Sequence, residues 1–262
     1  MHFTKMQGLG NDYLYVFGEA PYNAAELSRK LSDRHFGAGS DGMIYISRSD
    51  VADFRMRIFN ADGSEAAMCG NGIRCVAKYV YDKGYTDSTA LRIETLSGIR
   101  SLEMRTGSGV VKSVTVNMGR AEAGEEIRLN AGGETVSGIP VNVGNPHFVI
   151  FVDSIDAVPL YTLGPLIEKH EAVPGGINVE FVQVTDSGLR MRVWERGSGV
   201  TLACGTGACA SAAAAVRKGY YPAGIPVTVY LDGGPLDIIV SKYGGVTMTG
   251  PAEFVFEGDA EL

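Results

Sequence analysis

The sequence predicts an α/β chain of the α+β type, built from two homologous domains related by a pseudo-twofold axis. Each is expected to be a curled, mostly antiparallel sheet or barrel around a central helix. One observation is a repeat: "RMRIFNADGSEAAMCGNG" (55–72) and "RMRVWERGSGVTLACGTG" (190–207) share their opening, their closing Cys-Gly-x-Gly and the spacing between. A second is a constant offset: Cys69 and Cys204 are 135 residues apart, as are Tyr85 and Tyr220. So long a period indicates a duplicated domain, not a solenoid.

Composition agrees with two ordinary domains, which we place at 1–115 and 116–250, followed by a C-terminal tail. The 262 residues are 45% hydrophobic and 20% charged, enough to bury a core. A net charge of −7 argues against nucleic acid or an anionic membrane as partner. The start lacks an apolar signal region, and no run reaches the roughly 18 apolar residues of a membrane helix. With four cysteines, we expect a cytoplasmic protein with reduced thiols.

Each half shows strand patterns first and a long helix afterwards. Apolar runs bounded by Gly, Asn and Asp predict strands at "DYLYVFG", "GMIYIS", "FRMRIFN", "LRIETLSG" and "VKSVTVNMG". After each Cys-Gly-x-Gly the pattern changes, because "IRCVAKYVYDKG" and "ACASAAAAVRKG" hold good helix formers and end on Lys-Gly. We expect the alanine-rich helix to be buried on all sides. Further helices are predicted at 24–34 and near 163–171.

Cys-Gly-x-Gly therefore lies at the N-terminus of a helix in each half. Unpaired amides and the positive end of the helix dipole make such a place suited to an anion, and glycines let it approach closely. The same field is expected to lower the pKa of a thiol there. Each motif thus combines a reactive sulfur with a cradle for a carboxylate or phosphate.

Two such motifs facing one cleft would put thiols on opposite faces of a ligand, which suggests stereoinversion. One thiolate would remove a proton next to a carboxylate, and the other thiol would return one from the opposite face. No strand–GxGxxG–helix unit indicates a dinucleotide, and nothing indicates pyridoxal phosphate, so no cofactor is expected. The spacings from Cys69 to Cys75 and from Cys204 to Cys209 do not fit zinc motifs, so no metal is expected. Cys75 and Cys209, inside the helices, are interpreted as packing residues.

The sequence resembles the diaminopimelate epimerases over essentially the whole chain. The matching stretches are "GLGNDY" (8–13), "FNADGSEAAMCGNGIRC" (59–75), "VGNPHFV" (143–149), "INVEF" (177–181) and "WERGSG…ACGTGACA" (194–210). The resemblance implies two similar domains, with the final strand, 251–262, returning to the first. It implies interconversion of LL- and meso-diaminopimelate for lysine and peptidoglycan precursor synthesis, without cofactor or metal. The expected partners are this small amino acid and a second copy in a homodimer.

The resemblance also implies roles for individual residues. Cys69 and Cys204 would be the acid–base pair, with Cys204 accepting and Cys69 donating the proton in the LL-to-meso direction. His147 and Glu195 would tune the pKa values of the thiols. Arg196 is the natural bidentate partner of the far carboxylate. The substrate-binding residues would be Asn11, Asn60, Gly70, Asn71, Asn145, Asn178, Glu195, Arg196, Gly205 and Thr206. Two positions depart from the family pattern: Gly42, where some relatives carry glutamine, and Val200, in place of an acid.

Two other classes of function remain open from the residues alone. A proline or hydroxyproline racemase, or a phenazine-type isomerase, would share the duplicated architecture. Phenazine-type enzymes lack the paired cysteines, and proline racemases need no second carboxylate contact, so "NVEF" and "ERG" favour diaminopimelate. A binding or thiol-redox protein is the third class, but a redox protein would be expected to show C-x-x-C, which this sequence lacks.

Overall fold

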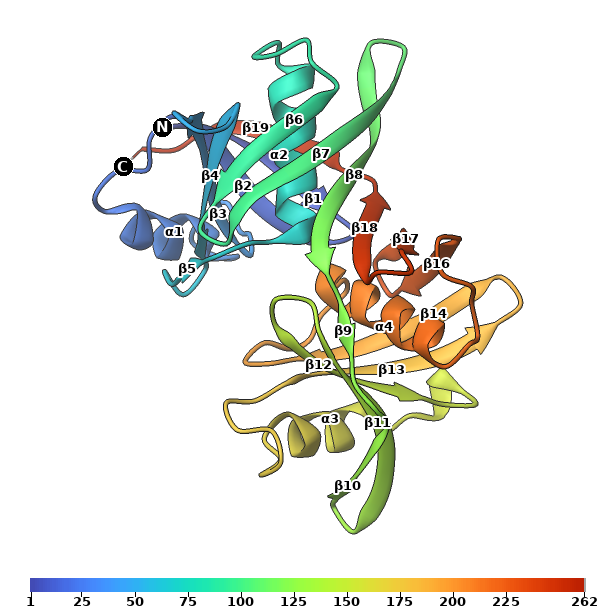
Figure 1. The fold of residues 1–262 in the computed structure, drawn as a ribbon. Helices are drawn as coiled ribbons and strands as arrows, with labels where there is room; N and C mark the ends of the chain where they lie inside the picture. Colours follow the sequence, from blue (N-terminus) through green and yellow to red (C-terminus); the bar gives the residue numbers. More distant parts are fainter. Residues whose placement is uncertain (262) are drawn as a thin grey trace. The chain divides into compact units, whose positions relative to one another are not determined.

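The computed structural model describes residues 1–261 and divides the chain into two units (Figure 1). The first comprises Met1–Asn117 together with the described residues from Gly250 onward, and the second is Met118–Thr249. No helix among the described residues is long and apolar enough to cross a membrane. Both units are mixed α+β, as the sequence predicts.

The first unit is a mostly antiparallel sheet with one long helix. Its strands are β1 (His2–Gly8), β2 (Asn11–Phe17), β3 (Gly42–Arg48), β4 (Phe54–Asn60), β5 (Glu65–Ala66), β6 (Ala90–Thr95), β7 (Gly98–Gly107), the start of β8 (Val110–Arg120) and β19 (Glu253–Asp259). Its helices are α1 (Ala24–Ser32) and α2 (Gly70–Asp82). Within this unit β2–β3 and β4–β6 pair in parallel. The C-terminal strand β19 pairs with β1 and so belongs to this unit.

The second unit repeats this order of pairings. Its strands are β9 (Glu122–Ala123), β10 (Ile127–Ala131), β11 (Glu134–Asn142), β12 (Pro146–Phe151), β13 (Asn178–Thr185), β14 (Gly188–Glu195), β15 (Gly199–Val200), β16 (Pro226–Leu231), β17 (Gly234–Val240) and β18 (Gly245–Gly250). Its helices are η1 (Ile155–Ala157), α3 (Leu160–Glu168) and α4 (Gly205–Arg217). The parallel pairs β12–β13 and β14–β16 correspond to β2–β3 and β4–β6. The duplicated sequence therefore folds into a duplicated topology.

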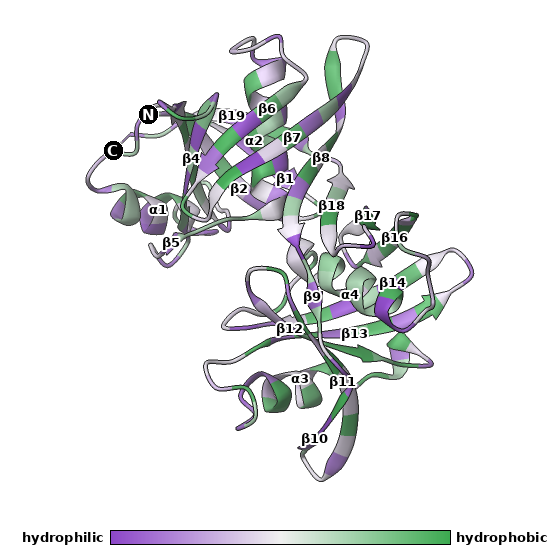
Figure 2. Cartoon of the chain, in the orientation of Figure 1, coloured by the Kyte–Doolittle hydropathy of each residue, from purple (hydrophilic) through white to green (hydrophobic). Residues whose placement is uncertain are grey.

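The two helices after Cys-Gly-x-Gly are confirmed and are the most buried helices of their units. In α2 every residue from Gly70 to Val80 is buried. In α4 the run from Gly207 to Ala215 is buried, and Figure 2 shows this helix pale green over most of its length. Small alanines let β9, β11–β14, β16 and β17 approach α4 closely. The prediction that the alanine-rich helix is buried on all sides is thus confirmed.

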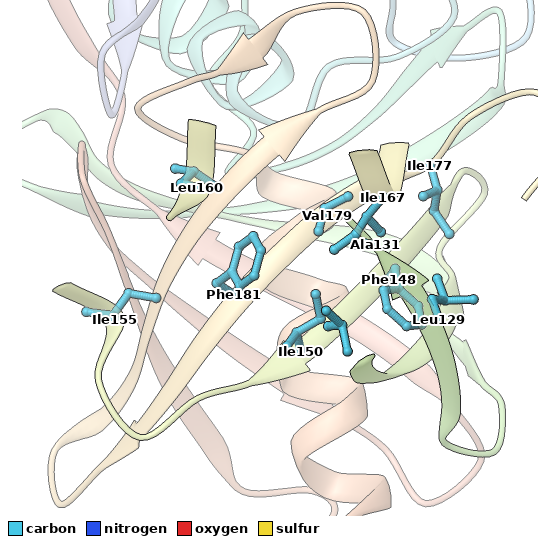
Figure 3. Packing of buried hydrophobic residues seen from close by; sticks show 11 residues of the cluster. Leu129, Ala131, Phe148, Ile150, Ile155, Leu160, Ile167, Ile177, Val179 and Phe181 are labelled. Carbon is cyan, nitrogen blue, oxygen red and sulfur yellow. The ribbon is translucent and has the colours of Figure 1, made fainter. Parts of the chain in front are cut away.

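The two shorter helices shift by a few residues from their predicted bounds. α1 ends at Ser32 because Asp33 leaves the helical conformation and accepts from the backbone amides of His35 and Phe36, each at 2.7 Å. α3 lies at 160–168, not 163–171, and it covers one side of the second unit's core. There Leu160 and Ile167 belong to one buried cluster with the strand residues Phe148, Ile150, Val179 and Phe181, which Figure 3 labels. Burial of each such side chain stabilises the unit by about 1.5–3 kcal/mol.

Candidate active site

A cysteine caps the N-terminus of the long helix in each unit. Cys69 precedes α2, and its Sγ accepts a hydrogen bond from the backbone amide of Gly72 at 3.3 Å. Cys204 precedes α4, and its Sγ accepts from Gly207 at the same distance, 3.3 Å. A cap of this kind satisfies the third amide of the helix and fixes the sulfur at the positive end of the dipole. Sequence and structure agree on this placement.

In the first unit, Asn11 connects the sulfur to a carboxylate. The Cys69 thiol donates to Oδ1 of Asn11 at 3.3 Å, and Nδ2 of Asn11 donates to Oδ2 of Asp41 at 2.7 Å. Asp41 also accepts from Arg34 at 2.8 Å. A carboxylate can only accept, so Asp41 fixes the Asn11 amide with its carbonyl facing the thiol. The Asn11 carbonyl thus accepts the hydrogen bond that the Cys69 thiol donates.

In the second unit, a longer chain of polar contacts leads away from the sulfur. Sγ of Cys204 lies 3.6 Å from Oγ1 of Thr206, to which Nδ2 of Asn145 donates at 3.3 Å. Oδ1 of Asn145 lies 3.0 Å from Nε2 of His147, and Nδ1 of His147 lies 2.7 Å from Oε1 of Glu180. His147 and Glu180 are both fully buried. His147 is the second residue of β12, directly after Pro146.

The prediction that the helix field lowers the pKa of both thiols is wrong for Cys204. Burial is the largest influence and raises the pKa of this thiol well above its ordinary value, and the carboxylates of Glu195 and Glu180 raise it further. The Gly207 amide and the Thr206 hydroxyl oppose the shift without reversing it. Burial also raises the pKa of Glu195, helped by the neighbouring charge of Glu180. Desolvation and like charge therefore outweigh the helix dipole at this cysteine.

The residues expected to cradle a carboxylate occupy the first turns of the helices. Gly70 and Asn71 open α2, and Gly205 and Thr206 open α4. The first amides of a helix have no partner within it. Oδ1 of Asn71 accepts a hydrogen bond from Arg74 at 3.0 Å, so this side chain is directed into the unit. The backbone amide of Asn71 is the group that lies at the start of the helix.

Glu195 and Arg196 lie where β14 ends. Glu195 accepts a hydrogen bond from the hydroxyl of Thr201. The backbone amide of Arg196 donates to Oδ1 of Asn178 at 3.0 Å, and its exposed guanidinium donates to the carbonyl of Gly175 at 3.2 Å. The buried carboxylate of Glu168 supports this turn by accepting from the backbone amide of Gly197 at 2.9 Å. The turn thus presents a carboxylate and a guanidinium on consecutive residues.

The other predicted asparagines have structural partners as well. Nδ2 of Asn60 donates to Oγ of Ser64 at 3.0 Å across the turn after β4. Nδ2 of Asn178 donates to the carbonyl of Pro146 at 3.0 Å while its Oδ1 holds Arg196. Each Nδ2 carries a second hydrogen, so these contacts leave a donor for a ligand.

The model of the family described as "Diaminopimelate epimerase" matches residues 3–123 and 139–255. A diaminopimelate epimerase of Phocaeicola vulgatus is 51% identical over 276 residues, covering 99% of this chain and 98% of that protein. One of Bacillus licheniformis is 49% identical, covering 98% and 97%. The chain belongs to the diaminopimelate epimerase family.

Solved structures of other proteins share this fold. A predicted epimerase from Pseudomonas aeruginosa aligns with a TM-score of 0.76 at 18% identity, covering 100% of this chain and 99% of that one. A probable proline racemase from Agrobacterium radiobacter aligns with a TM-score of 0.75 at 16% identity, covering 100% and 93%. At this identity the likeness shows the two-domain fold alone, and family membership rests on the sequence relatives.

The two departures from the family pattern now have structural explanations. A Cβ on Gly42 would lie 2.2 Å from the backbone carbonyl oxygen of Phe59, so this backbone admits no side chain there. A glutamine at this position would therefore require a different backbone. Val200 packs against the apolar core of the second unit, where it is partly buried with Trp194. An acid at that position would face apolar neighbours, and valine fits them better.

Three polar residues near the thiols were not predicted to belong to the site. They are Glu180, which contacts His147, Asp41, which contacts Asn11, and Tyr13. Tyr13 lies near Cys69 and Asn11, and burial raises the pKa of its phenol well above the ordinary value, which keeps it neutral. One signal was available for Glu180: a lone acid within the apolar run "INVEFV" needs a buried partner.

Proposed function

We propose that this chain interconverts LL- and meso-2,6-diaminopimelate, with Cys69 and Cys204 as an acid–base pair and without a cofactor. The observation that carries the proposal is the matched placement of the two cysteines. Each unit holds one sulfur as an N-cap, 3.3 Å from the third amide of its helix. Chance placement of two packing cysteines would not be expected to repeat this geometry in both halves of a duplicated fold.

The proposed reaction moves one proton off the α-carbon and one proton on. In the LL-to-meso direction, the Cys204 thiolate takes the α-proton and becomes a thiol. The bonding electrons pass into the α-carboxylate, where helix amides stabilise the added charge. The Cys69 thiol then donates its proton to the opposite face and is left as a thiolate. The Asn11 carbonyl that accepts from Cys69 supports its role as the donor.

The raised pKa of Cys204 suits a base that must act on a very weakly acidic carbon. A thiolate with a high pKa is a stronger proton acceptor, at the cost of a smaller population near neutral pH. Protonated Glu195, whose pKa is also raised, or the ammonium group of a bound amino acid would reduce the negative charge near the sulfur. Binding of substrate is therefore expected to favour the thiolate.

Recognition of the far end of the substrate is assigned to Arg196. Its guanidinium is exposed and makes one hydrogen bond, to the carbonyl of Gly175, which leaves a planar fork for a carboxylate. Asn60, Asn145, Asn178 and Glu195 are proposed to bind the ammonium groups and the α-carboxylate, together with the helix amides. A proline-type substrate has no distal carboxylate and would leave Arg196 without a partner.

The decisive experiment is proton exchange in D2O. LL-diaminopimelate incubated with the protein should incorporate deuterium at the α-carbon and reach a mixture with the meso form. Proline and hydroxyproline serve as matched controls and should incorporate none. Exchange into proline, with none into diaminopimelate, would move the chain to the racemase class.

We also propose a cytoplasmic homodimer acting in lysine and peptidoglycan precursor synthesis. The dimer is favoured by apolar side chains on the C-terminal strand: Phe254, Val255 and Phe256 are 36%, 52% and 44% exposed. Light scattering coupled to gel filtration would measure the mass. A monomer at micromolar concentration would contradict the dimer without affecting the proposed chemistry.

A further inference from the structure

The buried side chain next to the third residue of each capped helix differs between the two units. A Cβ added to Gly72 in α2 would lie 2.8 Å from Cδ1 of Ile44, an apolar contact. A Cβ added to Gly207 in α4 would lie 2.8 Å from Oε1 of Glu180 and 3.2 Å from Sγ of Cys204. Ile44 and Glu180 occupy corresponding places in "GSDGMIYI" and "GGINVEFV". A carboxyl group therefore takes the place of an aliphatic side chain under one sulfur only.

The hydrogen bonds of Glu180 and His147 determine which atoms donate and which accept in the series of contacts that leads to Cys204. Oδ1 of Asn145 only accepts, so Nε2 of His147, 3.0 Å away, carries a hydrogen. The second proton of the pair lies between Nδ1 and Oε1 of Glu180, 2.7 Å apart. A neutral histidine without this carboxyl could place its single proton on either nitrogen. The Asn145 amide could then reverse and present its carbonyl to Thr206.

The same carboxyl group also places negative charge close to the sulfur. Among the described residues, Oε2 of Glu180 has no hydrogen-bond partner, although the side chain is fully buried. The titratable groups that act on Cys204 from the packed strands are Glu180 on β13 and Glu195 at the end of β14, and His147 on β12 contacts Glu180. The two carboxyl groups favour the thiol over the thiolate.

We propose that Glu180 is a positioning residue for proton transfer at Cys204: it holds His147 by Nδ1, orients the Asn145 amide toward Thr206, and sets a negative charge beneath the first turn of α4. This inference rests on the proposed role of Cys204 as one of the two acid–base thiols. Gly207 is required by the same arrangement, because a side chain there would displace the carboxyl group. Glu180 itself does not touch the reacting atoms and acts through its neighbours.

The test is the rate of Cys204 alkylation by iodoacetamide as a function of pH, measured by peptide mass spectrometry on Glu180→Gln. Glutamine keeps the shape and removes the charge. Loss of charge should dominate over any reversal of Asn145, because the Thr206 contact with sulfur is long, at 3.6 Å. We expect Cys204 to react on the order of tenfold faster at pH 7, with its profile moved to lower pH. With LL-diaminopimelate, the pH optimum of kcat/KM should move the same way.

Cys69 in the same protein is the matched control, and its alkylation profile should not change. Accelerated alkylation of Cys69, Cys75 and Cys209 together would report unfolding, and Glu180→Ile, which copies the counterpart Ile44, would then replace the glutamine variant. An unchanged Cys204 profile in a folded variant would overturn the proposal. The alkylation assay needs no substrate, so it gives an answer even if diaminopimelate proves not to be turned over.

Discussion

The two capped cysteines share a backbone and differ in nearly every side chain around them. Asn11 presents its carbonyl to Cys69, whereas Asn145 presents its amide nitrogen toward Cys204 through Thr206. Two residues after each asparagine stands Tyr13 in the first unit and His147 in the second. Duplication thus preserved the helix N-terminus that positions the sulfur. Divergence of the neighbours then gave each sulfur its own hydrogen-bond partners.

The turn before each cysteine has diverged in the same way. In the aligned segments Ala61 stands where the second unit has Arg196, and Asn60 stands where it has Glu195. Of these two turns, the second therefore carries a guanidinium, which is proposed to bind the distal carboxylate. In the proposed mechanism, substrate recognition and acid–base strength are divided unequally between two halves of similar fold.

The largest expected effect comes from removing either sulfur. Cys69→Ala and Cys204→Ala should each lower epimerisation by a factor on the order of 10³ or more in both directions, because each thiol is proposed to serve one face of the carbon. Cys75→Ala and Cys209→Ala, within the helices, should keep most activity. Rates of stereoinversion measured from both isomers check this. Appreciable turnover by either single variant would remove the two-base assignment.

Removal of Arg196 should have the next largest effect. Arg196→Met leaves the far carboxylate without a partner in the bound state, which costs about 2–5 kcal/mol for a desolvated charge pair. We expect kcat/KM for diaminopimelate to fall at least tens-fold while both thiols stay reactive toward alkylation. Ala61→Ser, at the corresponding place in the first unit, is the control and should change kcat/KM little. Near-normal kinetics for Arg196→Met would mean that the substrate is wrongly assigned.

The glycines at the third position of each helix allow a direct comparison. Gly72→Ala would press on Cδ1 of Ile44 and Cε of Met56, which are flexible ends of apolar side chains. Gly207→Ala would press on Oε1 of Glu180, which is held by His147. We expect Gly207→Ala to lower kcat/KM about tenfold and Gly72→Ala to lower it clearly less. Thermal unfolding checks the stability of both variants. Equal losses of kcat/KM would show that Ile44 and Glu180 have equivalent roles next to these glycines.

The sequence predicted the fold class, the duplication and both capped helices, because these depend on local patterns and on a repeat within one chain. Helix ends were less accurate, since Asp33 ends α1 through side-chain contacts that propensity does not contain. The pKa of Cys204 was predicted in the wrong direction because the helix dipole is visible in a motif, whereas burial and the Glu180 carboxylate arise from packing. Gly42 was noted as a departure, but the backbone contact that excludes a side chain there depends on strand pairing with β4.

The smallest expected effect separates a packing thiol from the acid–base thiols. Burial raises the pKa of Cys75 from its ordinary value of 9.0 to about 11, so the folded state retains this proton at a pH where the unfolded chain releases it. Stability from the buried thiol is thus present below pH 9 and is lost as pH rises toward 11, by at most about 1.4 kcal/mol per pH unit.

Cys75→Ala should lower the free energy of unfolding by about 1 kcal/mol at pH 7, and this deficit should shrink or reverse by pH 10.5 in urea unfolding. Val76→Ala, a neighbouring buried residue that does not titrate, should show a deficit that does not change with pH. A constant deficit for Cys75→Ala would mean that this thiol ionises as easily in the folded protein as in the unfolded chain.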